Sequence, residues 1–166
     1  MDARDFEVTI RPRTETFRVG DRPEFDVCIR NRGASTAYFV ASVDGSDAGA
    51  SPRVTIEIEG PPDAYGFSSG RRCGYMNGVN EEDFLAVLPG EEFDPYVHGW
   101  VGAKLRSGRF RKPGRFTARF RYVTTEQDPA AWWQSQEGSP SESILRLLAR
   151  VPRVELEATT SFDVVP

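Results

Sequence analysis

The chain has 166 residues, 39% of them hydrophobic and 28% charged, which suits one soluble domain that buries a core without metal or disulfide staples. Its formal net charge of -4 and its pI of 5.2 argue against a nucleic-acid-binding domain, since such domains are usually basic. The N-terminus lacks the basic start and apolar stretch of a signal peptide, and no window approaches the ~18 apolar residues of a membrane span. The sequence therefore predicts a cytoplasmic protein with no membrane contact, unless a leader has been removed.

Alternation of apolar and polar residues predicts strands along the first sixty residues. The expected strands are Phe6 to Ile10, Phe17 to Val19, Phe25 to Ile29, Ala37 to Val43 and Val54 to Ile58. Cys28 is expected on the strand face opposite Val27 and Ile29. A disulfide between Cys28 and Cys73 stays open as an alternative, although a leaderless chain usually keeps its thiols reduced.

Residues 63–80 show no periodicity and are rich in glycine, so a long loop is expected there. Loops of this length are often functional or mobile. This loop holds side chains of the types that dominate contact energy at interfaces, namely Tyr65, Phe67, Arg71, Arg72 and Tyr75.

Two Pro-Gly turns mark the second half of the chain, Leu88-Pro89-Gly90-Glu91 and Lys112-Pro113-Gly114-Arg115. Each is expected to lead into a strand of an antiparallel sandwich. The strands expected here are Phe84 to Leu88, Val97 to Leu105, Phe116 to Tyr122 and Val154 to Val164, the last with a possible bulge.

A helical excursion over about residues 128–151 interrupts the strands. Ser139-Pro140-Ser141-Glu142 predicts a capping box with proline at the first helical position. The expected apolar face is Ile144, Leu145, Leu147 and Leu148, and Pro152 ends the helix. Asp128-Pro129 can cap a shorter turn that holds Trp132 and Trp133, of which one is expected to be exposed. The fold predicted for residues 1–166 is therefore a single all-β domain, an immunoglobulin-like antiparallel β-sandwich with a short helical insertion before the last strand.

Few catalytic sites can be built from these residues. His98 is the only histidine, which excludes an HExxH zinc protease and a four-ligand Cys/His zinc site. Gly66-Phe67-Ser68-Ser69-Gly70 matches the GxSxG nucleophile elbow, but that motif needs a strand and a helix of an α/β sheet around it. We therefore expect a protein that is not an enzyme and takes no cofactor, with a serine hydrolase using Ser68 as a remote alternative.

Charge is segregated along the chain. Residues 95–125 contain no acid and eight bases, and the acidic groups Glu81-Glu82-Asp83 and Glu91-Glu92 come shortly before them. Segregated charge can steer a partner, or it can reflect strands that pair across a sheet face. The sequence leaves both interpretations open.

The segments Asn80 to Glu91 and Lys112 to Phe116 resemble bacterial and fungal immunoglobulin-like accessory domains, including the β-sandwich part of deuterolysin-type metallopeptidases. The opening from Phe25 to Gly33 is similar as well, and also resembles intracellular proteinase inhibitors of bacilli. These motifs mark strands and turns. The resemblance therefore implies a sandwich and brings no catalytic residue with it.

Three functions are expected, in this order. The first is a non-catalytic binding or adaptor module that contacts a protein partner, the second is an intracellular proteinase inhibitor presenting residues 63–80, and the third is the hydrolase. The candidate binding residues are Tyr65, Phe67, Arg71, Arg72, Tyr75, Trp132 and Trp133. If these side chains prove to be core residues, the basic stretch from Lys104 to Arg121 is the next place to look.

Overall fold

The computed structural model describes residues 1–42, 52–67, 79–96, 108–128, 132 and 140–166. The elements in chain order are η1 (Ala3–Asp5), β1 (Phe6–Pro12), β2 (Thr16–Arg18), β3 (Phe25–Asn31), β4 (Ala37–Val40), β5 (Arg53–Glu59), β6 (Tyr65–Phe67), η2 (Glu81–Asp83), β7 (Phe84–Val87), β8 (Glu92–Phe93), β9 (Gly108–Phe110), β10 (Gly114–Val123), α2 (Glu142–Leu148) and β11 (Glu155–Val165).

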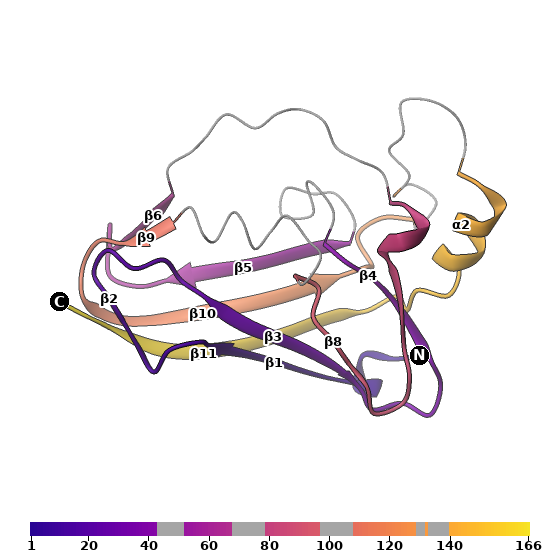
Figure 1. The fold of residues 1–166 in the computed structure, drawn as a ribbon, viewed down its shortest axis with the longest axis horizontal. Helices are drawn as coiled ribbons and strands as arrows, with labels where there is room; N and C mark the ends of the chain where they lie inside the picture. The colour runs from indigo at the N-terminus through magenta and orange to yellow at the C-terminus, as the bar shows by residue number, and fades with distance from the viewer. Residues whose placement is uncertain (43–51, 68–78, 97–107, 129–131, 133–139) are drawn as a thin grey trace.

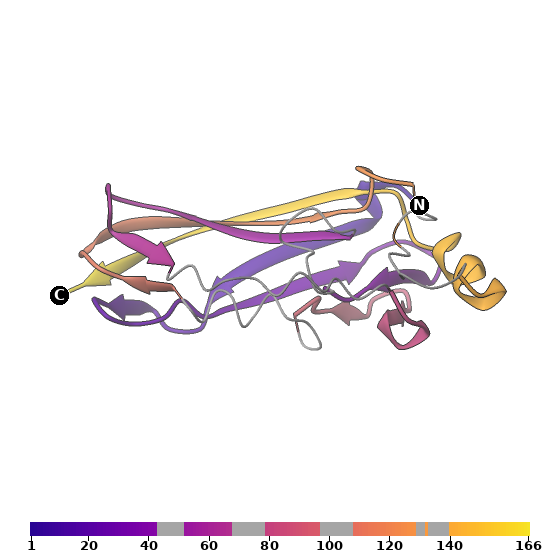
Figure 2. The same cartoon turned by 90° about the horizontal axis from the view of Figure 1, so that it is seen from above.

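The strands form two layers, seen face-on in Figure 1 and edge-on in Figure 2. One layer is the sheet β2-β11-β10-β5, and the other contains the sheet β1-β3-β8 and the pair β4-β7. A further short pair, β6-β9, lies toward the end of the sandwich where the C-terminus lies. The predicted all-β sandwich with a short helix before the last strand is confirmed. One pair departs from the antiparallel expectation, because β2 runs parallel to β11.

The long sheet is built from the two strands with the longest alternation. β10 and β11 pair without interruption from Gly114↔Val164 to Val123↔Glu155, so the bulge considered for the last strand is absent from this pairing. β5 covers the other edge of β10 from Thr117↔Glu59 to Val123↔Arg53. Since side chains of a strand alternate between faces, every second residue of β10 enters the core.

The main core lies between the layers and is rich in aromatic rings. Phe39 of β4 stacks on Phe93 of β8 with ring centroids 5.1 Å apart, and Phe116 of β10 stacks on Phe162 of β11 at 5.8 Å. Full burial of such a side chain contributes about 1.5–3 kcal/mol. Tyr122 joins the layers by a polar contact as well, because its hydroxyl donates to the Val40 carbonyl at 2.9 Å and accepts from the Val40 N–H at 3.1 Å.

A second core lies under helix α2. Its buried members are Val40, Val79, Phe84, Trp132, Ile144, Leu148 and Val151. The helix begins two residues later than predicted, because its N-cap is Ser141, whose hydroxyl accepts from the Ile144 N–H at 3.3 Å. The expected apolar face is also narrower, since Leu145 is 43% exposed.

In the part of the chain that the structure describes, no helix is long and apolar enough to cross a membrane.

Both Pro-Gly turns lie where the sequence predicts them. Gly90 has φ +87° and Gly114 has φ +150°, conformations that favour glycine. A Cβ at Gly114 would also come within 2.7 Å of the Pro61 Cγ. These turns lead into β8 and β10, as expected.

Several short elements differ from the predictions. The expected loop over residues 63–80 begins as strand β6, which pairs with β9 from Tyr65↔Phe110 to Phe67↔Gly108. The strand expected from Ala37 to Val43 is β4, and it ends at Val40. Residues 81–83 and 3–5 form single turns of 3-10 helix that the sequence analysis missed. The strand expected from Val97 to Leu105 lies outside the described residues.

Candidate functional site

The structure places two of the candidate binding residues in packed positions. Trp132 is only 2% exposed and packs in the core under α2, so it cannot present its ring to a partner. Tyr65 is half-buried, its ring lies 5.5 Å from that of Phe110, and burial raises the pKa of its hydroxyl to about 12. A Cβ on Gly108 would collide with the Tyr65 hydroxyl, which shows how closely this side chain packs on β9. Both residues act in packing.

The other predicted residues are not brought together. Phe67 closes strand β6. The remaining candidates lie outside the described residues, as does the GxSxG serine: Arg71, Arg72, Tyr75, Trp133 and Ser68. A binding role for those positions therefore stays a prediction.

Most of the described bases between residues 95 and 125 form hydrogen bonds or ion pairs within the fold. Arg115 pairs with Asp163 at 2.8 Å, and Arg119 pairs with Glu157 at 3.0 Å across β10 and β11. Arg109 and Lys112 donate to backbone carbonyls, those of Gly20 and Pro62. The acidic partners of β10 come from β11 and not from residues 81–94. Cross-strand pairing accounts for Arg115, Arg119 and Arg121, while Lys104 and Arg106 lie outside the described residues.

That acidic segment borders an open groove between β7 and β8. β7 and β8 follow each other through the turn at residues 88–91, yet β7 pairs with β4 and β8 pairs with β3. Figure 1 shows β8 diverging from the preceding segment after this turn. Between the strands lies an open groove of about 400 Å³, the β7–β8 groove, lined by Val27, Cys28, Leu85, Ala86, Val87, Glu92, Phe93 and Asp94.

Asn31, at the end of β3, stabilises the closed end of this groove, which lies beside the turn at residues 88–91. Its fully buried amide donates to the carbonyls of Val87 at 2.9 Å and Ser35 at 2.8 Å, and its side-chain oxygen accepts from the Gly33 N–H at 3.0 Å. The side chain thus ties β3 to the last residue of β7. The sequence analysis missed this role because Asn31 precedes Arg32-Gly33 in what looks like an ordinary turn.

Pro95 explains why β8 is so short. The antiparallel register, with Ile29 opposite Phe93, would place Pro95 opposite Val27. Proline has no N–H to donate to a ladder, and the Pro95 carbonyl accepts from the Ser42 N–H at 3.0 Å instead. The chain therefore leaves β3 after two pairs, and this is a signal that the sequence does contain.

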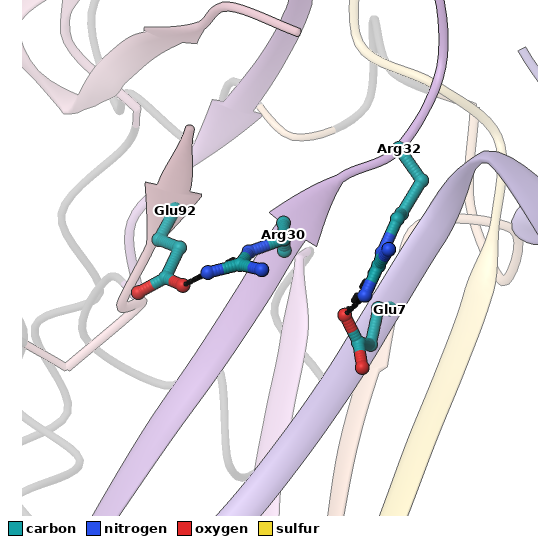
Figure 3. Close-up of polar contacts among 4 residues, drawn as sticks. All are labelled: Glu7, Arg30, Arg32 and Glu92. Carbon is teal, nitrogen blue, oxygen red and sulfur yellow. Dashed lines mark hydrogen bonds and ion pairs between the residues drawn. The ribbon is translucent and has the colours of Figure 1, made fainter. Parts of the chain in front are cut away.

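A second open groove, of about 380 Å³, adjoins the first on the outer face of β1, β3 and β8. Thr9 and Cys28, two short side chains, lie opposite each other on β1 and β3 in the middle of this groove. Longer charged side chains surround them. Figure 3 shows two of the ion pairs, Arg30 with Glu92 and Arg32 with Glu7. The two grooves share Cys28 and Glu92, and so they form one continuous depression.

Burial and hydrogen bonding set the protonation states of Cys28 and Glu92, the two residues that both grooves share. Burial, reinforced by a hydrogen bond to the Glu92 carboxylate, raises the pKa of the Cys28 thiol to about 11. Hydrogen bonds from Arg30 and then from Cys28 lower the pKa of Glu92 below its usual range. Near neutral pH the depression therefore offers a neutral, free thiol and a carboxylate. A protonated thiol is a poor nucleophile, so this arrangement suits binding.

Metal ligands are not gathered here. Within the described ranges, no group of three or more His, Cys, Asp or Glu side chains could hold a metal ion. The groove can supply apolar area, carboxylates and backbone groups.

No family model and no curated protein matches this chain. Two solved structures are similar to it at a TM-score of 0.35 each. One is a β-glucosidase from Erythrobacter marinus, 15% identical, of which the match spans 96% of this chain and 15% of the enzyme chain. The other is a chain described with fibronectin binding and biofilm formation by the AAF fimbriae of enteroaggregative Escherichia coli, 13% identical over 96% of this chain and 99% of its own.

Proposed function

We propose that this chain is a non-catalytic binding module that acts through protein–protein contacts at the β7–β8 groove. One observation carries the proposal: two consecutive strands belong to different sheet pairs and leave an open groove of about 400 Å³ between them. Sheet edges are places where proteins commonly accept another chain.

The lining of the groove suits this role. Leu85 and Ala86 supply accessible apolar side chains above the buried core residues Val27, Val87 and Phe93, while Glu92 and Asp94 supply carboxylates at its side. An apolar centre with a polar rim is the usual anatomy of a protein interface. The inhibitor function expected from residues 63–80 has no such support, since that segment begins in the paired strand β6 and continues outside the described residues.

The test is a selection of displayed short random peptides on the full chain, followed by hydrogen exchange of the selected complexes. We expect enriched peptides that slow amide exchange within residues 84–94. Peptides that protect only other parts of the chain, or no enrichment over a library passed over blank resin, would overturn the proposal.

A matched pair of variants adds a control. Ala86 is exposed and lines the groove, so Ala86→Trp fills part of it without touching the core, whereas Thr159→Trp adds the same ring on the outer face of β11. Selected peptides should lose binding to the first variant and keep binding to the second.

A further inference from the structure

We infer that the partner of the β7–β8 groove is an extended, basic segment of a protein, which adds as a strand to the open edge of β7. The inference rests on the proposed function and specifies the partner of that same groove. It follows from the backbone of β7, from the opposite wall and from the charge around both.

The hydrogen-bonding alternation of β7 leaves one edge open. The Ala41 N–H donates to the Asp83 carbonyl at 2.9 Å, just beyond the last pair of β4 and β7. Because bonded and non-bonded pairs alternate in an antiparallel ladder, Leu85 and Val87 bond to β4 and Ala86 directs its N–H and C=O to the other side. That side is the groove, which Ala86 lines. Ala86 therefore offers a donor and an acceptor in the spacing that an added strand requires.

Residues of β3 and β8 form the opposite wall of the groove. The Arg13 N–H donates to the Glu24 carbonyl at 3.0 Å, which fixes the alternation of β3 and turns the backbone groups of Val27 away from β1. Strand β8 ends before it reaches Val27, so β8 does not pair with β3 at that residue. An extended chain has side chains on both faces. Its inward side chains would contact the half-buried Leu85, and this contact favours apolar residues at every second position.

The charge of the residues around β7 determines which outward side chains are favoured on the added strand. Residues 79–96 contain no Lys or Arg and six acids, namely Glu81, Glu82, Asp83, Glu91, Glu92 and Asp94. These acids flank both ends of β7. Arg30 neutralises Glu92, but no base of the described chain lies within ion-pair distance of Glu81, Glu82, Asp83 or Glu91. Outward side chains of an added strand are therefore favoured when they are basic, and an acidic strand is repelled.

The experiment measures binding of a six-residue peptide of alternating arginine and valine to the full chain by fluorescence anisotropy. We expect binding that weakens with added salt, and at least about tenfold weaker binding of the matching glutamate–valine peptide. A third peptide keeps the arginine–valine sequence but carries N-methyl groups on alternate amides. It should bind at least about tenfold more weakly, because it cannot pair with a strand edge.

Two variant pairs locate the site. Ala86→Pro removes the N–H that faces the groove while leaving the bonds to β4, and Ala86→Ser keeps it, so only the proline should reduce binding. Glu82→Lys and Glu57→Lys change the net charge equally, but Glu57 lies on the outer face of β5 in the other layer. Only Glu82→Lys should reduce binding. If Ala86→Pro does not fold, the N-methyl peptide tests the same hydrogen bonds on the unaltered chain.

The outcomes separate this inference from the proposed function. Equal binding of the arginine and glutamate peptides, or full binding of the N-methyl peptide, would overturn the basic-strand inference. If random peptides of another composition still protect residues 84–94, the groove remains a protein-binding site with a different partner. Binding that shifts sedimentation toward a dimer in the absence of peptide would instead assign the edge to a second copy of this chain.

Discussion

Strands β10 and β11 pair along their whole length in one layer, whereas β8 in the other layer pairs with β3 over two residues and leaves β7 beside an open groove. Both regions place aromatic side chains in the same core, as Phe120 of β10 and Phe93 of β8 show. The difference lies in the strand edges. In the long sheet nearly all backbone groups of β10 are used by two neighbours, while in the other layer a turn and a proline keep adjacent strands apart.

The proposed binding role gives the two regions different tasks. The long pairing of β10 with β11 and β5 holds one layer of the sandwich together. The β7–β8 region contributes less pairing and keeps an edge available. The five predictions below test that division of roles, from the largest expected effect to the smallest.

The first prediction compares one side chain from each region. Phe120 of β10 is fully buried, whereas Leu85 of β7 is half-buried and lines the groove. Phe120→Ala should lower the free energy of unfolding by about 3–5 kcal/mol, and Leu85→Ala by less than about 1.5 kcal/mol. Urea unfolding followed by circular dichroism measures both values. Equal losses would show that the groove wall is as much a part of the core as β10.

The second prediction concerns Trp132, which the sequence analysis placed in a binding patch. Because its ring is buried among Phe84, Ile144 and Leu148, Trp132→Ala should lower the free energy of unfolding by about 3–5 kcal/mol. Thermal and urea unfolding measure the change, with Leu145→Ala on the exposed side of α2 as the control. A loss below about 0.5 kcal/mol would indicate that the Trp132 side chain is exposed at the surface.

The third prediction tests the clamp at the closed end of the groove. Asn31→Ala removes three hydrogen bonds of a fully buried amide and should cost about 1–3 kcal/mol. The loss should come with faster amide exchange in β7, since Asn31 ties β3 to Val87. Asn31→Asp keeps the acceptor for the Gly33 N–H but loses the two donated bonds, so it should speed exchange in β7 as Asn31→Ala does. Unchanged exchange in β7 would contradict the clamp.

The sequence predicts the long strands and both Pro-Gly turns because these depend on local patterns. Alternation in Phe116 to Tyr122 and Val154 to Val164 identifies the core faces, and Gly90 and Gly114 have the conformations that glycine favours. The helix is predicted at the right place, and its start is wrong by two residues because either Ser139 or Ser141 can serve as a cap.

The groove could not be predicted in the same way. Whether β7 pairs with β8 or with β4 depends on contacts between distant residues, such as those of Asn31 with Val87, which no local pattern encodes. The aromatic side chains Tyr65 and Trp132 look like contact residues in the sequence because composition does not distinguish an exposed ring from a buried one. Pro95 was the available signal, since a proline just after two strand residues limits pairing.

The fourth prediction concerns Cys28, the residue shared by both grooves. Its pKa of about 11 lies above the ordinary 9.0, so the folded state favours the protonated thiol. The resulting contribution to stability is fully present below pH 9 and is lost as the pH rises through about 11. In a Cys73→Ser variant, the rate of alkylation by iodoacetamide should rise with a midpoint near pH 11 in the folded chain and near pH 9 in urea. A midpoint near 9 for the folded chain would mean that the thiol is not shielded in the groove floor.

The fifth prediction returns to the closed sheet, where the smallest effect is expected. Arg119 and Glu157 form an ion pair of 3.0 Å across β10 and β11, and both side chains are about half exposed. Such a pair should contribute about 0.2–1 kcal/mol, because solvent screens the attraction and two side chains lose freedom. A double-mutant cycle with Arg119→Ala and Glu157→Ala isolates this coupling, although Glu157 also lies 3.8 Å from Arg121. A coupling above about 2 kcal/mol would give the charged face of β10 a structural role comparable to its core face. With the small coupling expected here, the ion pairs between β10 and β11 mainly cancel charge, whereas Glu81, Glu82, Asp83 and Glu91 beside β7 have no base of the described chain within ion-pair distance.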